Sequence, residues 1–251
     1  MLATTAPTTS TNDRPSVAYD VPAVIADIAG RDEQRPVLTM VHLLLGSHGV
    51  RAEVTDAYRA IRWDVGVLHD DARECYVPAR SLEGAEAVRW GPDGLQVLRR
   101  RRRRLVAEPL DALSLDEVGE FPRFDVVLRT ALEAATLEVE LPDWRTLDVV
   151  ARAAYHLARA ADAAERLLPD RHPLRRAEQL HLNGDGAHHP ATGLHLGGRS
   201  EVEMTVNVMF LAEMVGALGR HARASSPLKP LTWQGAEGDA RWVGALMPVR
   251  V

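Results

Sequence analysis

The spacing of apolar residues changes period near residue 123, and this change limits what the chain can fold into. Before it, the apolar segments 87–90 and 95–98 flank Gly-Pro-Asp-Gly, a turn sequence that predicts a β-hairpin. After it, apolar residues recur every three or four positions over 124–135, which predicts a helix. Strands followed by helices are typical of the α+β class.

Two longer helices are expected further along the chain. The first spans 143–168 and has a narrow, alanine-rich apolar face. The second spans 204–218, follows the capping-box sequence Ser200-Glu-Val-Glu203, and is apolar on nearly every side, as a central buried helix is. Apolar segments on both sides of Gly-Ala-Glu-Gly at 235–238 predict a closing β-hairpin.

The N-terminal part is less regular. A short helix is expected over 21–29 and another over 54–63, while the apolar run 37–45 suits either a strand or a helix. No internal repeat is evident. The sequence therefore predicts an α+β fold with a disordered tail over 1–18 and a single domain over 19–251, built from an N-terminal mixed part with a β-hairpin, a helical C-terminal half and a short closing hairpin.

Composition narrows the classes of function. The 251 residues carry a net charge of −5, which argues against a nucleic-acid partner, since such proteins are usually basic. No segment approaches the roughly 20 apolar residues of a membrane span, and no secretory signal is present, so a cytoplasmic location without membrane contact is expected. Lys229 is the only lysine, and this arginine bias indicates a GC-rich coding genome, such as that of an actinobacterium.

A histidine-rich segment is the main candidate for chemistry. His181, His188, His189 and His195 lie in one glycine-rich stretch with Asp185. Imidazole titrates near neutrality and suits proton transfer, and the segment leads to a predicted helix N-terminus that favours an anionic ligand. We therefore expect His188, His189 or His195 to act as acid or base, oriented by Asp185.

Glu213 is a further candidate, because a carboxylate inside an apolar helix is costly unless it is paired or protonated. The sequence contains no P-loop, no Rossmann glycine motif after a strand and no Gly-x-Ser-x-Gly elbow. These features favour a biosynthetic enzyme of secondary metabolism that acts on a small-molecule substrate without a cofactor. The reaction class stays open between cyclisation, dehydration, isomerisation and acyl transfer.

Two alternatives remain at this point. In one, the protein binds a ligand or partner without catalysis: the run Arg99–Arg104 docks an acidic carrier protein and the apolar helix forms a homodimer interface. In the other, His69-Asp70-Asp71 and a distant histidine form the iron site of a non-haem metal enzyme. The only cysteine, Cys75, allows no disulfide within the chain.

Overall fold

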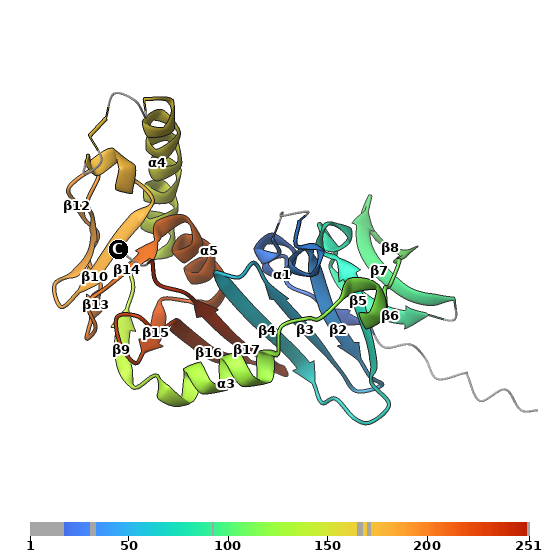
Figure 1. The fold of residues 1–251 in the computed structure, drawn as a ribbon. Helices are drawn as coiled ribbons and strands as arrows, with labels where there is room; N and C mark the ends of the chain where they lie inside the picture. The colour runs from blue at the N-terminus through green and yellow to red at the C-terminus, as the bar shows by residue number, and fades with distance from the viewer. Residues whose placement is uncertain (1–17, 31–33, 92, 165–167, 170–171, 250–251) are drawn as a thin grey trace, which may run out of the picture.

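Figure 1 shows a computed structural model of the protein, which describes residues 18–30, 34–91, 93–164, 168–169 and 172–249. The predicted tail over 1–18 lies almost wholly outside the described residues. Residues 19–109 are called the N-terminal half below. Its elements are β1 (Tyr19–Asp20), α1 (Val24–Ile28), η1 (Pro36–Thr39), β2 (Met40–Leu45), β3 (Gly49–Thr55), β4 (Arg59–Gly66), β5 (Arg73–Pro78), η2 (Ala79–Leu82), β6 (Ala87–Gly91), β7 (Gly94–Arg101) and β8 (Arg104–Pro109).

A connecting segment over 110–136 holds α2 (Leu115–Val118) and α3 (Phe124–Ala134). Residues 137–249 are called the C-terminal half. Its elements are β9 (Leu137–Glu140), α4 (Trp144–Ala163), η3 (Pro173–Arg176), β10 (Gln179–Asn183), β11 (Gly186–His189), β12 (Leu194–His195), β13 (Arg199–Ser200), β14 (Met204–Asn207), α5 (Val208–Leu218), β15 (His221–Ala224), β16 (Leu231–Glu237) and β17 (Ala240–Leu246).

The described strands form three antiparallel sheets. The largest has nine strands in the order β13-β9-β15-β16-β17-β4-β3-β2-β5, and the two others have four each, β1-β6-β7-β8 and β12-β11-β10-β14. Strands β4 and β17 join the two halves, with Trp63 opposite Trp242 and Ile61 opposite Gly244. Helices α1 and α5 pack on this sheet as part of the main core, while α3 covers β16 and β17 as part of a second, smaller cluster.

Both halves use the same exchange of strands. In the N-terminal half, β1 precedes the meander β2–β4 but pairs with β6, while β5 precedes the meander β6–β8 but pairs with β2. In the C-terminal half, β9 pairs with β15 and β14 pairs with β10 in the same crossed manner. This repeat lies in the topology and not in the sequence, where no repeat is evident. A single domain over 19–251 stays a prediction.

The predicted helical C-terminal half is wrong, because the described residues of this half form mainly antiparallel strands, with α4 and α5 as their α-helices. Residues 204–207 do not begin a helix: they form β14 and bond to β10. Ser200 is not the N-cap, since its hydroxyl bonds to Val202. Asn207 caps α5, and its side chain accepts from the backbone N–H groups of Met209 and Phe210.

The expected helix over 54–63 is also wrong, since these residues end β3 and begin β4 around a tight turn. The run 37–45 resolves into η1 and strand β2. Other elements are confirmed: the hairpins β6–β7 and β16–β17, and the helices α3 and α4. Asp143 caps α4 by accepting from Arg145 and Thr146, and its bonds to Thr146 lower the pKa of the Asp143 carboxyl.

Candidate nucleic-acid interface

The predicted histidine loop is a small sheet. His181, His188 and His195 lie directly opposite one another on β10, β11 and β12, in register with Thr205 on β14. The three imidazoles therefore form a row across one face of this sheet. Burial, followed by the charges of Arg176 and His188, lowers the pKa of His181.

The other predicted site residues do not join this row as a catalytic group. His189 is fully buried, and its ring bonds to the Ala177 carbonyl and the Thr192 hydroxyl at 2.7 and 2.8 Å, a structural role. Asp185 lies in the turn between β10 and β11 and offers its backbone carbonyl, not its carboxylate, to His195 at 2.7 Å. The residues were predicted on a loop, and the strand pairing places His188 and His189 on opposite faces.

Glu213 lies on the solvent side of α5, with its side chain half exposed, and not in an apolar interior. Its carboxylate pairs with the guanidinium of Arg59, which is buried in β4. Arg59 also bonds to Asp56 at 2.8 Å and lies over the Phe210 ring, 4.3 Å from its centre. Glu213 is thus part of the contact between the two halves.

No group of three or more histidine, cysteine, aspartate or glutamate side chains among the described residues is placed to hold a metal ion. The His69-Asp70-Asp71 segment lies after β4, where the ring of His69 meets His48 edge-on with 5.4 Å between centroids.

Sequence reasoning missed a hydrogen-bonded network around the buried side chains of His42 and Glu53 in the N-terminal half. Both ring nitrogens of His42 face carboxylate oxygens, Glu53 at 2.8 Å and Glu74 at 2.9 Å, and the ring stacks on Tyr76. Burial, and then the Glu74 carboxylate, raise the pKa of Tyr76. These residues line one side of a 600 Å³ cavity under the connecting segment. An isolated histidine in an apolar run, His42 in 37–45, was the only sequence signal.

The predicted arginine run is a hairpin end. Arg102 and Arg103 form the two-residue turn between β7 and β8 at φ 44° and 71°, a conformation that such turns require and that disfavours side chains larger than glycine. Arg99 and Arg101 pair with Glu108 and Arg100 pairs with Glu86, at 2.5–3.1 Å. Three of the six arginines are therefore already paired within the chain, with two carboxylates between them.

A groove open to solvent lies between α4 and α5. It has a volume of about 460 Å³ and is lined by Trp144, Asp148, Ala151, Arg152, Tyr155, His156, Met209, Ala212, Glu213 and Gly216. Arg145, Arg152 and Arg159 recur every seven residues, so they share one side of α4, and all three are exposed. Together the groove and these arginines form a surface, called the α4–α5 face below, that suits an anionic polymer.

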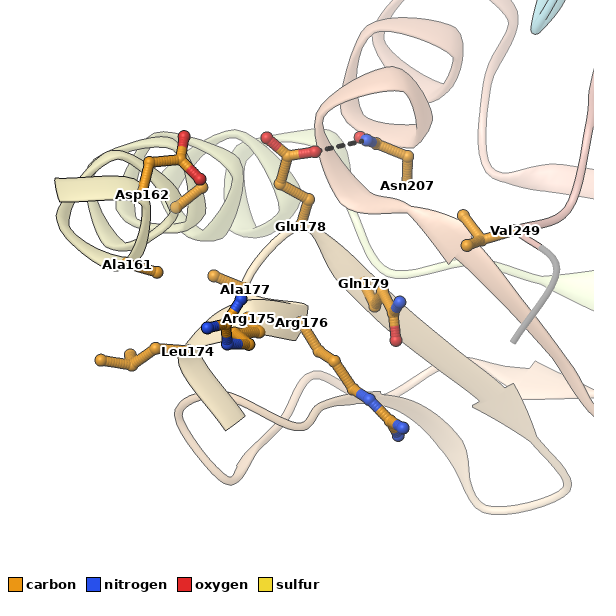
Figure 2. A pocket seen from close by; sticks show the side chains of 11 residues that line it. Ala161, Asp162, Leu174, Arg175, Arg176, Ala177, Glu178, Gln179, Asn207 and Val249 are labelled. Atoms are coloured by element: carbon orange, nitrogen blue, oxygen red, sulfur yellow. Dashed lines mark hydrogen bonds between the residues drawn. The ribbon is translucent and has the colours of Figure 1, made fainter. Parts of the chain in front are cut away.

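A second cavity, of about 480 Å³, lies at the far end of α4 (Figure 2). Glu178 accepts a hydrogen bond from Asn207 at 3.2 Å there, and Asp162 and Arg176 line the same space. The Gln179 side-chain oxygen is buried without a hydrogen-bond partner in the described residues.

No family model matches the chain, and no curated protein matches its sequence. Solved structures do match its fold. The DNA polymerase III beta chain of Streptococcus pneumoniae is 18% identical, with a TM-score of 0.57 over 98% of this chain and 67% of that chain. The beta subunit of Thermotoga maritima is 12% identical, with a TM-score of 0.56 over 98% and 68%. A DNA polymerase sliding clamp of Pseudomonas aeruginosa is 16% identical, with a TM-score of 0.55 over 96% and 70%.

These matches correct the predicted function. A biosynthetic acid–base enzyme and a non-haem metal enzyme are wrong, because the matched structures are subunits or clamps of DNA polymerase. The expected small-molecule substrate, acidic carrier protein and lack of a nucleic-acid partner are wrong for the same reason. No helix in the described part of the chain is long and apolar enough to cross a membrane. Over nearly its whole length, the chain has the fold of a DNA polymerase sliding clamp.

Proposed function

We propose that this chain is a clamp-type protein of the cytoplasm that assembles around DNA and supports a DNA polymerase without catalysing a reaction itself. The observation that carries the proposal is the likeness to polymerase clamps over 96–98% of the chain. The α4–α5 face adds to it, since it offers exposed arginines on a helical surface. The chain spans about two thirds of the length of those clamps.

The ends of the molecule support assembly from several copies. Strands β8 and β12 are outer strands of their sheets and lie at opposite ends of the molecule (Figure 1). Leu105 and Val106 on β8 and Leu194 on β12 are exposed. An exposed edge strand is a template for pairing with another chain, and a contact between two different edges gives a ring when the rotation closes. We infer that β8 of one copy meets β12 of the next.

Cross-linking tests this arrangement. Val106→Cys and Leu194→Cys are introduced together and treated with a short bis-maleimide, and each single variant serves as a control. Cys75 does not react with the maleimide, because burial raises the pKa of its thiol to about 12. The double variant is expected to give one closed oligomer resistant to SDS, and the single variants none. Efficient cross-linking of a single variant, or none in the double variant, contradicts head-to-tail assembly.

The cross-linked oligomer also tests whether the protein encircles DNA. Cross-linking in the presence of a nicked circular plasmid is expected to leave protein on the circle through SDS and high salt, because only topology then holds it. Cutting the plasmid once releases the protein. Equal retention on circular and linear DNA, or no retention on the circle by a closed oligomer, overturns the proposed function.

A further inference from the structure

Two large aromatic side chains line the α4–α5 groove but are not buried in the protein core. Trp144 is 50% exposed and Tyr155 is 47% exposed. They are eleven residues apart on α4, which places them about 16 Å apart along the helix axis. The other residues that line the groove include the small Ala151, Ala212 and Gly216, which leave room between the two helices. A planar group that enters it meets an aromatic ring at either end.

The charges beside the groove suit a phosphate backbone. Arg145 and Arg159 have no carboxylate partner in the described part of the chain, and Arg159 lies over the Tyr155 ring, 5.8 Å from its centre. Arg152 pairs with Asp148 at 2.7 Å, but this pair is exposed and contributes little. The one carboxylate on the α5 side, Glu213, is paired with Arg59.

We propose that the α4–α5 groove binds unpaired bases of single-stranded DNA: the bases stack on Trp144 and Tyr155 while Arg145, Arg152 and Arg159 hold the phosphates. This inference rests on the proposed function, because that function brings DNA to the α4–α5 face. Stacking on aromatic rings requires a free base face, which a duplex does not offer. The groove therefore recognises a single-stranded stretch or an unpaired end, in addition to any contact that the arginines make with duplex phosphates.

The test compares a labelled oligothymidylate with a labelled duplex hairpin of the same charge, by fluorescence anisotropy at fixed salt. Trp144→Ala is expected to weaken oligothymidylate binding by about 5- to 100-fold and to leave hairpin binding unchanged. Trp144→Phe keeps a stacking face and is expected to restore most of the affinity. Val149→Ala is the matched control, since Val149 is 67% exposed on α4 but does not line the groove, and it is expected to change neither affinity.

Three results overturn the inference. The first is equal loss of oligothymidylate and hairpin binding in Trp144→Ala, and the second is equal loss in Trp144→Ala and Val149→Ala. The third is a change in the oligomeric mass of Trp144→Ala while its affinity for oligothymidylate is unchanged. This result would assign the groove to a contact with another protein. The cross-linking assay reports on ring closure alone, so failure of the proposed function is distinguishable from failure of base stacking.

Discussion

The two halves of the molecule share one strand exchange but fill it with different helices. After its first strand, the N-terminal half has α1 with five residues, and after β5 it has only a 3-10 turn, η2. At the equivalent positions the C-terminal half has α4 with twenty residues and α5 with eleven. The same sheet frame therefore tolerates helices of very different length, and the longer pair forms an exposed groove.

The halves also differ in how they are held together internally. The C-terminal half relies on apolar burial, with Trp233 fully buried under the apolar helix α5. The N-terminal half buries charge as well, in Glu53, which contacts His42 and Arg62, and in Arg59 at the contact between halves. Apolar contacts tolerate changes of pH and salt, whereas ionic contacts depend on them. The two halves should thus respond differently to the same perturbation.

The largest effect is expected from Trp233→Ala. This side chain is 1% exposed and donates from its ring nitrogen to the Gly219 carbonyl at 3.0 Å. Its loss leaves a large cavity and is expected to lower the free energy of unfolding by about 3–5 kcal/mol, measured by urea titration. Trp144→Ala, which removes an exposed tryptophan from the same half, is the control and should change stability by less than about 1 kcal/mol.

This variant also tests whether the halves unfold together. A maleimide reacts with the thiolate form of a cysteine. Because Cys75 is buried in β5 of the N-terminal half, its labelling reports opening of that half. Because β4 and β17 share one hydrogen-bonded ladder, Trp233→Ala should accelerate Cys75 labelling by the same factor as global unfolding. An unchanged labelling rate in the destabilised protein would show that the C-terminal half opens alone.

Arg59→Ala is expected to have the next largest effect and to lower the free energy of unfolding by about 3 kcal/mol. The substitution removes a buried cation and leaves the Asp56 carboxylate without its ionic partner. Glu213→Gln removes only the half-exposed end of the same contact and should cost about 0.5 kcal/mol. Thermal unfolding of both variants measures the difference. Similar costs for both would mean that Arg59 is held by Glu213 and not by Asp56 and Phe210.

The smallest effect is expected from one titratable side chain of the C-terminal half, His181. The pKa of His181 is lowered in the folded state, so the unfolded chain binds the proton more readily. The contribution of His181 to stability is complete at pH values above its pKa in the unfolded chain, about 6.5. This contribution is lost as the pH falls through its pKa in the folded protein. Hydrogen exchange, corrected for intrinsic rates, should accelerate in β10–β12 at low pH, and His181→Gln should reduce that acceleration. Equal acceleration in the wild-type protein and in His181→Gln would show that another group causes the pH dependence of this sheet.

Local patterns identified several elements correctly. The turn sequence at 91–94 and the glycine pair around 235–238 marked hairpins, and the helical period marked α3 and α4. The fold class could not be reached in this way. The pairing of β1 with β6, or of β9 with β15, joins strands far apart in sequence, and no local period encodes it.

The candidate site was harder to predict than the fold. Crowded histidines suggested catalysis, but the hairpin pairing that sets them in a row depends on strand register, which composition does not reveal. The segment 204–218 looked like one apolar helix, yet its first four residues complete a sheet and Asn207 starts the helix. The overall charge of −5 hid the arginines of α4, because a net charge averages over surfaces.

The stacked pair Trp63 and Trp242 has a practical consequence. Their rings face each other across β4 and β17, nearly parallel, with 5.2 Å between centroids. Indoles this close couple their electronic transitions, so the pair should give its own feature in circular dichroism, distinct from that of the other tryptophans. The chain thereby carries a spectroscopic reporter at the junction of its halves, and any motion that separates the two rings can be followed without a label.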